Sequence, residues 1–311
     1  MSLADLAQIS NYAVASATGV VGLAFLAHLA EWGFAKAPVP VSVAAGQAES
    51  AESAESAGPE RVDASTVLSS IAVSLTGLSI ALLAVGSLTR GLAAERVPWS
   101  NMYEFALTGS LIALTVYFVL VRIWDAAWLG IFVTGFALVL LGIGFSVYVP
   151  AGPVVPALHS YWLVIHVAAV MIAGALFLVS AAASVLFLLK SRAEERNTVG
   201  TFLARVPEPM VLDRVAFRVI AVAFPIWTFG ALIAGPIWAY DAWSRYWGWD
   251  PKEVWALITW IVYAGFLHAR VTAGWRGRRV AILCLIGFAT FLFSFYGVNL
   301  LFGGSQHTYA K

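Results

Sequence analysis

Histidines and tryptophans are the residues of this sequence whose spacing could do chemistry. Six of the 13 tryptophans lie between Trp238 and Trp260. An imidazole can bind a metal ion, and an indole offers a flat apolar surface with one polar N–H. One or two tryptophans are usual where a membrane meets water, but six in one short connection are too dense for such a belt. The pattern predicts a platform for a large, flat, apolar ligand. The 5 histidines are His28, His159, His166, His268 and His307.

The composition indicates a membrane protein. Of 311 residues, 61% are hydrophobic and 11% are charged, whereas a soluble domain has about 25% charged residues. The net charge of +1 excludes a general electrostatic attraction to nucleic acid. The single cysteine, Cys284, excludes an intramolecular disulfide and a CxxC pair. Any thiol chemistry must therefore come from a partner.

Several apolar runs are long enough to span a bilayer. A spanning segment must pair its own backbone groups, so these runs are expected to be helices. The sequence predicts an all-α polytopic membrane protein with about eight transmembrane helices. The expected spans are roughly 11–33, 66–89, 101–123, 127–149, 160–189, 217–239, 252–271 and 279–302.

The chain is expected to have three parts. Residues 1–33 form the first transmembrane helix, and residues 66–311 form a seven-helix domain that includes the tryptophan-rich segment at 235–260. Residues 34–65 between them repeat Ala-Glu-Ser and show no hydrophobic periodicity. This composition predicts a disordered cytoplasmic linker without a site.

The placement of basic residues predicts the orientation. With eight spans both termini lie on one side, and 13 of the 18 Lys and Arg residues then fall in segments on the other side. Because basic segments stay in the cytoplasm, both termini and the tryptophan-rich loop are expected to face outward.

The histidines fall at two expected depths. His28 and His268 lie near the inner ends of their spans, whereas His166 and His307 lie at the outer level with the tryptophans. A histidine in a membrane helix needs a partner, and packing or hydrogen bonding is the simpler role for any single one. Two pairs suggest two bis-imidazole sites. Haem iron takes two axial imidazoles in apolar surroundings, whereas zinc usually takes a third or fourth ligand; haem is favoured over zinc.

Carboxylates near the tryptophans have two interpretations. Asp250 followed by Pro251 and Glu253 has the pattern of a helix N-cap, and Asn101 to Glu104 has a weaker version. Asp241 and Asp250 could also orient indole N–H groups or a ligand imidazole. Both roles remain open from the sequence.

The segment WAYDAWSRYWGWDPKEVWALITW resembles the WWD signature of haem-handling membrane proteins of cytochrome c maturation. The flanking pieces VPALHSYWLVIHV, ITWIVYAGFLHAR and FYGVNLLFGGSQHTYA, with PWSNMYEF and LAFLAHL upstream, are similar to the CcsA/ResC branch of System II. The resemblance covers every span but not the Ala-Glu-Ser linker.

The resemblance implies a function. Such proteins deliver haem b across the membrane and present it on the outer face for thioether attachment to the CxxCH motif of an apocytochrome c. His166 and His307 match the outer axial ligands, and His268 matches a ligand within the membrane; His28 falls where relatives carry a first-helix histidine. We expect haem to lie against Trp243, Trp247 and Trp249, with Trp255, Asp241 and Asp250 nearby.

The resemblance also implies partners and a location. A ResB-like membrane protein would complete the holocytochrome c synthase, and thiol-reducing proteins would act upstream on the apocytochrome. The expected location is a bacterial plasma membrane, with the thylakoid membrane as the alternative. Two other functions remain open: export of haem or another apolar cofactor without attachment, and a membrane cytochrome b.

Overall fold

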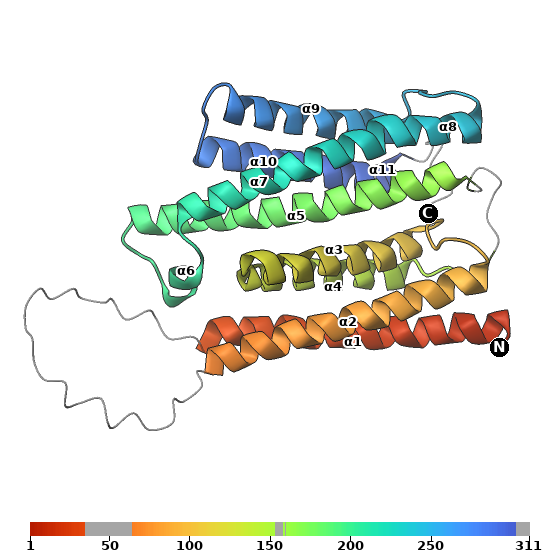
Figure 1. Ribbon diagram of the computed structural model, residues 1–311, viewed down its shortest axis with the longest axis horizontal. Coiled ribbons are helices and arrows are strands. Elements are labelled where there is room, and N and C mark those ends of the chain that lie inside the picture. Colours follow the sequence, from red (N-terminus) through yellow and green to blue (C-terminus); the bar gives the residue numbers. More distant parts are fainter. Residues whose placement is uncertain (35–63, 153–157, 159, 303–311) are drawn as a thin grey trace, which may run out of the picture.

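The computed structural model describes residues 1–34, 64–152, 158 and 160–302, and the regular structure within these ranges is helical (Figure 1). Short 3-10 and π-helical segments, labelled η, interrupt the α-helices. The elements are α1 (Leu3–Phe34), α2 (Ala64–Ala94), α3 (Met102–Trp124), η1 (Ala127–Leu129), α4 (Gly130–Ser146), α5 (Tyr161–Glu195), α6 (Thr201–Arg205), α7 (Pro209–Trp227), η3 (Thr228–Ala234), α8 (Gly235–Trp243), α9 (Pro251–Val271), α10 (Arg278–Leu292), η4 (Phe293–Gly297) and α11 (Val298–Leu301).

Eight helical stretches in the described residues are long and apolar enough to cross a membrane. The predicted all-α polytopic class and each of the eight expected spans are therefore confirmed. Some boundaries differ: the first span begins at Leu3 and the fifth ends at Glu195. The sixth span runs from Pro209 to Trp243, because α7, η3 and α8 continue one another. The tryptophan-rich segment thus begins as helix and becomes a loop only after Trp243. The expected linker falls almost entirely on residues 35–63, outside the described ranges.

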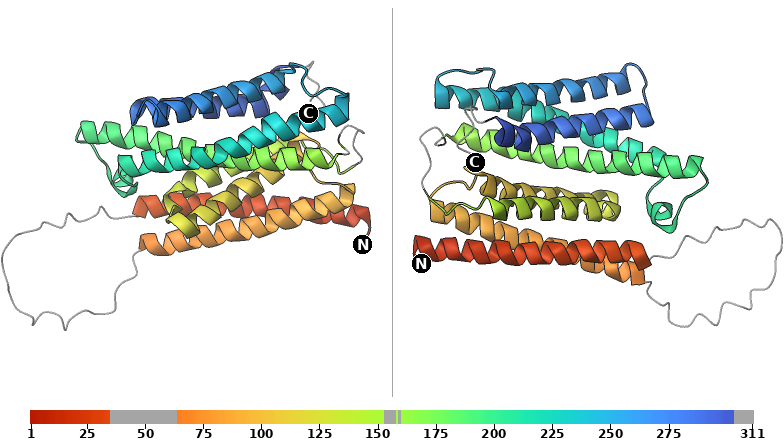
Figure 2. Two further views of the ribbon diagram at one scale, coloured as in Figure 1. Left: turned by 45° about the horizontal axis from the view of Figure 1, so that its top comes forward. Right: turned by 180° about the vertical axis from the view of Figure 1, so that it is seen from behind.

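Helix α5 lies between two groups of helices (Figures 1 and 2). On one side, α1 packs on α2 and α4, and α3 packs on α4 and α5. On the other side, α7 and α10 pack on α5, and α9 packs on α7 and α10. In all three views α1 and α9 lie on opposite sides of the bundle.

Small residues allow the first two helices to approach closely. A Cβ on Gly86 of α2 would lie 2.7 Å from Cγ2 of Val14 in α1. The hydroxyl of Ser10 donates a hydrogen bond of 2.8 Å to the Gly86 carbonyl. Such small-residue contacts are typical of helix pairs in membranes, where the hydrophobic effect does not drive association.

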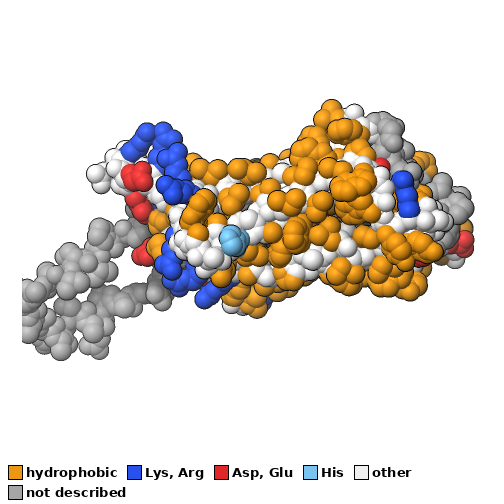
Figure 3. Space-filling model, turned by 90° about the horizontal axis from the view of Figure 1, so that it is seen from above, with side chains coloured by type: hydrophobic (Ala, Val, Ile, Leu, Met, Phe, Trp, Pro, Cys, Tyr) orange, Lys and Arg blue, Asp and Glu red, His pale blue; other side chains and the backbone are white. Residues whose placement is uncertain are grey.

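The two ends of the bundle differ in charge. Lys and Arg side chains gather at the end that lies away from α8, on the left in Figure 3. The N-terminus of α1 lies at the α8 end (Figure 1). This asymmetry is the one from which the orientation was predicted, and the outward placement of the α8 end stays a prediction.

A buried ion cluster joins α2 to α3 at the α8 end. The Asn101 side chain accepts the Glu104 backbone N–H, so the expected cap is confirmed. The Glu104 carboxylate itself is fully buried and accepts from Nε of Arg90 at 3.0 Å and from Nη1 of Arg96 at 2.8 Å. It also accepts the Ser100 amide at 2.9 Å. Sequence reasoning assigned Glu104 to helix capping and missed this ion cluster.

We expect Glu104→Ala to destabilise the protein. Removing the carboxylate leaves two guanidinium groups largely buried without their anion, which typically costs about 3–5 kcal/mol. The measurement is the thermal unfolding midpoint in detergent, with Glu194→Ala as the control because Glu194 is exposed at the end of α5. Equal midpoints for the two variants would contradict the assigned role of the cluster.

Candidate functional site

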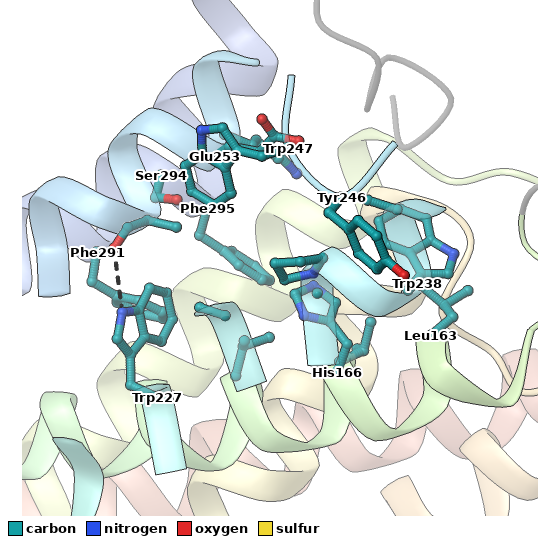
Figure 4. Close-up of a pocket in the computed structure, with 18 of the residues that line it drawn as sticks. Leu163, His166, Trp227, Trp238, Tyr246, Trp247, Glu253, Phe291, Ser294 and Phe295 are labelled. Carbon is teal, nitrogen blue, oxygen red and sulfur yellow. Dashed lines mark hydrogen bonds between the residues drawn. The ribbon is translucent and has the colours of Figure 1, made fainter. Parts of the chain in front are cut away.

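A pocket opens beside α5 at the end of the bundle that carries α8. Its cavity volume is about 120 Å³, and further empty space lies where it opens to solvent. Its walls are mainly aromatic and aliphatic (Figure 4). The lining residues used below are His166, Trp238, Trp243, Tyr246, Trp247, Lys252, Glu253, Ser294 and Phe295.

His166 lines the pocket from α5. Its Nδ1 lies 2.8 Å from the carbonyl oxygen of Gly230. Because a carbonyl only accepts hydrogen bonds, Nδ1 must carry the proton, and Nε2 is the basic nitrogen of the neutral ring. The ring stacks on Trp238 with centroids 5.8 Å apart and planes 15° apart. Metal-binding histidines are commonly held in this way, with the second ring N–H donated to a carbonyl or carboxylate.

The carbonyl that holds His166 belongs to a π-helical segment. Within η3 the Gly235 N–H bonds to the Gly230 carbonyl, one residue further back than in an α-helix. Pro225 and Pro236, which lack an N–H, lie on either side of η3. A Cβ on Gly230 would lie 2.8 Å from Cβ of Ala169, so glycine lets η3 approach α5. π-Helical turns are frequent at functional sites.

A second π-helical segment faces the same pocket. Ser294 and Phe295 of η4 contribute to its lining. The pocket therefore lies between two helices that both depart from α-helical geometry at this depth. No sequence pattern predicted either segment.

The tryptophans of the predicted platform do not all lie in one place in the structure. Trp243 and Trp247 line the pocket, and Trp243 packs edge-on against Trp238 with centroids 4.9 Å apart. Trp249 is 70% exposed and touches Trp247. Trp255 packs on Phe293, with centroids 4.1 Å apart. Trp238 was not among the predicted ligand-binding residues, although it is the tryptophan that stacks on His166.

The first half of α9 is fixed by two indole N–H groups. Trp260 donates to the Thr228 hydroxyl at 2.9 Å, and Trp227 donates to the Ala256 carbonyl at 3.3 Å. Figure 4 marks the second bond. These bonds hold α9 against the segment that positions His166.

The loop between α8 and α9 is held by the predicted cap. Asp250 accepts the Lys252 amide at 3.0 Å, and Glu253 accepts the amides of Gly248 at 2.8 Å and Asp250 at 3.0 Å. The capping interpretation is therefore confirmed. Trp249 has a left-handed φ of 56°, which only a well-held loop imposes on a bulky residue.

Asp241 of α8 connects two parts of the site. Its Oδ2 accepts a hydrogen bond of 3.0 Å from the hydroxyl of Ser160. Ser160 is also the N-cap of α5, the helix that carries His166. Asp241 therefore sets how α8 meets the start of α5. His159 and His307 lie outside the described residues.

The structure does not bring His28 and His268 together. His28 of α1 is buried, with Nδ1 3.1 Å from Glu31 and Nε2 3.2 Å from the Tyr117 hydroxyl. His268 is exposed on α9, and Thr272 lies 3.4 Å from its Nδ1. The predicted pairing rested on depth alone, and these helices lie on opposite sides of the bundle. The structure does not test whether either histidine binds iron; because both ring nitrogens of His28 have partners, we expect a structural role for it, and His268 stays a predicted ligand.

No group of three or more His, Cys, Asp or Glu side chains arranged for a metal ion occurs among the described residues. The described residues therefore offer no such cluster for the zinc site that the sequence left as an alternative.

The comparisons with known proteins identify the family. A family model described as Cytochrome C assembly protein matches residues 79–305. The chain belongs to this family. The match begins within α2, so α1 and His28 lie outside it. The predicted resemblance, the role in cytochrome c maturation and the multi-pass membrane location are confirmed at this level.

The names of individual relatives agree with the family model. The cytochrome c biogenesis protein CcsA of Synechococcus elongatus is 36% identical over 76% of this chain and 87% of its own length. The CcsA protein of Porphyra purpurea is 33% identical over 78% of this chain and 88% of its own length. The solved structure of cytochrome c haem lyase CcmF aligns with a TM-score of 0.65 and 16% identity. This alignment covers 94% of the present chain and 46% of CcmF, and it supports the fold.

We expect Glu253→Ala to loosen the loop at 244–250. The substitution removes the acceptor of two amides, and a hydrogen bond to a charged group contributes about 1.5–3 kcal/mol, so amide exchange should quicken at least roughly tenfold. Hydrogen–deuterium exchange followed by mass spectrometry measures this. Glu253→Gln, which keeps one acceptor oxygen, should give a smaller change, and unchanged exchange in Glu253→Ala would contradict the assignment.

We expect His28→Ala to lower stability without changing haem spectra. It removes both hydrogen bonds of a buried ring, which costs about 1–3 kcal/mol in total. The measurements are the thermal midpoint and the haem absorption per mole of protein. His268→Ala is the comparison because His268 is exposed. Loss of haem bands from His28→Ala at an unchanged midpoint would restore His28 as an iron ligand.

Proposed function

We propose that this chain is the haem-handling subunit of a cytochrome c synthase. In this proposal the pocket beside α5 holds haem b at the outer face of the membrane, for thioether attachment to an apocytochrome c CxxCH motif. The support comes from family membership, from relatives whose names give cytochrome c biogenesis, and from the pocket's chemistry.

The observation that carries the proposal is the setting of His166. A ring with Nδ1 bonded to the Gly230 carbonyl is a preoriented neutral imidazole with a basic Nε2. It stands on the wall of an aromatic pocket, which suits an iron porphyrin. The same residues would suit a soluble metal ion poorly, because the lining is mainly apolar.

Each group at the site has a proposed task. His166 would be one axial ligand, and His307, outside the described residues, would be the other. Trp238 holds the His166 ring in plane, and Trp243 and Trp247 cover apolar surface of the ligand and exclude water. The chain's contribution to attachment is then positioning of the reactants.

The attachment itself needs no oxidant. Each cysteine of the apocytochrome adds its sulfur and hydrogen across one haem vinyl double bond, which forms a C–S bond and a C–H bond. The cysteines must be reduced beforehand, so thiol-reducing proteins are proposed to act upstream. The CxxCH histidine would replace one protein ligand of the iron.

The proposed route of haem to the pocket begins within the membrane. His268 remains the proposed ligand within the membrane, and its exposure on α9 puts any haem there at the bundle surface. A second axial ligand would then come from the proposed ResB-like partner. We place the chain in a bacterial plasma membrane with the α8 end outward.

We expect His166→Gly to lower haem affinity at least tenfold. Mutating a residue that only hydrogen-bonds to a metal ligand already lowers metal affinity about 10–100-fold. The purified protein, expressed with a ResB-like partner, would be titrated with haem and followed by its absorption bands. Holocytochrome yield, measured by haem stain, should fall in parallel.

Two comparisons make this test specific. Added imidazole should restore the bands of His166→Gly, because it can fill the space of the deleted ring and supply the nitrogen. Ile165→Ala is the control, since Ile165 neighbours His166 on α5 and does not line the pocket. Wild-type bands and yield in His166→Gly would overturn the site.

A further inference from the structure

Lys252 is a charged residue on the wall of an otherwise mainly apolar pocket. It lies in the first turn of α9 and lines the same pocket as His166 and Trp247. Its position is fixed, because its own backbone N–H donates to Asp250 Oδ1 at 3.0 Å. The side chain therefore starts from a rigid point beside the ligand space.

Within the part of the chain that the structure describes, the ammonium group of Lys252 has only the nearby charge of Asp250 to offset its burial. No hydrogen bond or ion pair of its Nζ occurs there. The carboxylates on either side are committed to backbone groups: Asp250 caps α9, and Glu253 holds the amides of Gly248 and Asp250.

A charged group without a hydrogen-bonded partner at an apolar wall is unfavourable unless a ligand supplies that partner. Removing an ammonium from water costs free energy that an anionic partner offsets. The first turn of a helix also favours negative charge, because its dipole leaves partial positive charge there. Both features select an anionic group on the ligand at this wall of the pocket.

We propose that Lys252 binds a carboxylate of the pocket's ligand and fixes which edge of it faces α9. This inference rests on the proposed function. Haem carries two propionates on one half of its ring and two vinyl groups on the other half. Holding a propionate at Lys252 turns the vinyl-bearing half away from the start of α9. Lys252 is thus a positioning residue.

The test compares a residue change with a ligand change. Purified wild-type and Lys252→Met proteins are titrated with haem and with haem dimethyl ester, in which both carboxylates are blocked. Lys252→Met should weaken haem binding about tenfold or more, as expected for a charge-assisted hydrogen bond, and should leave ester binding unchanged. Lys252→Arg should keep most of the preference for the free acid.

The controls separate this inference from the proposed function. Arg278→Met changes an exposed cation at the start of α10 and should alter neither titration. If Lys252→Met weakened the binding of haem and of the ester equally, while the haem absorption bands still depended on His166, the carboxylate contact alone would be overturned. Failure of the wild type to bind either ligand would overturn the site and the contact together.

Discussion

The close approach of α5 to the π-helical segment η3 is the contact on which the site depends. Gly230 makes it feasible, because a Cβ there would lie 2.8 Å from Ala169 Cβ and 3.1 Å from the Val170 nitrogen. The approach brings the Gly230 carbonyl to His166 Nδ1 and so selects the ring's tautomer. Gly235 also contributes, since a Cβ there would lie 3.0 Å from the same nitrogen.

The π-helical segment η3 between α7 and α8 meets two requirements at once. A membrane span must pair its backbone groups internally, yet a ligand site needs groups that deviate from a regular helix. A π-helical turn keeps the ladder closed while it changes which residues face α5. Helix α9 then completes the wall, and its capping box holds the loop that carries Trp247.

The first four helices contribute packing and buried polar networks. His28 lies among Glu31, Tyr117 and Gly130, where an added Cβ on Gly130 would collide with the ring. Glu104 forms ion pairs with both Arg90 and Arg96, one residue away from Phe105, which lines the pocket. These networks hold α3 in place and so support one wall of the site from behind.

The eight spans, the cap at Asp250 and Glu253, and the family could all be predicted from the sequence. Each of these depends on local composition or short spacing, which the chain carries regardless of its neighbours. Tertiary structure alone decided that Trp238 stacks on His166, that Trp249 faces outward and that Glu104 is buried between two arginines. It also separated His28 from His268. Position along a helix gives depth in the membrane, but the rotation of that helix and its neighbours decide which side chains meet.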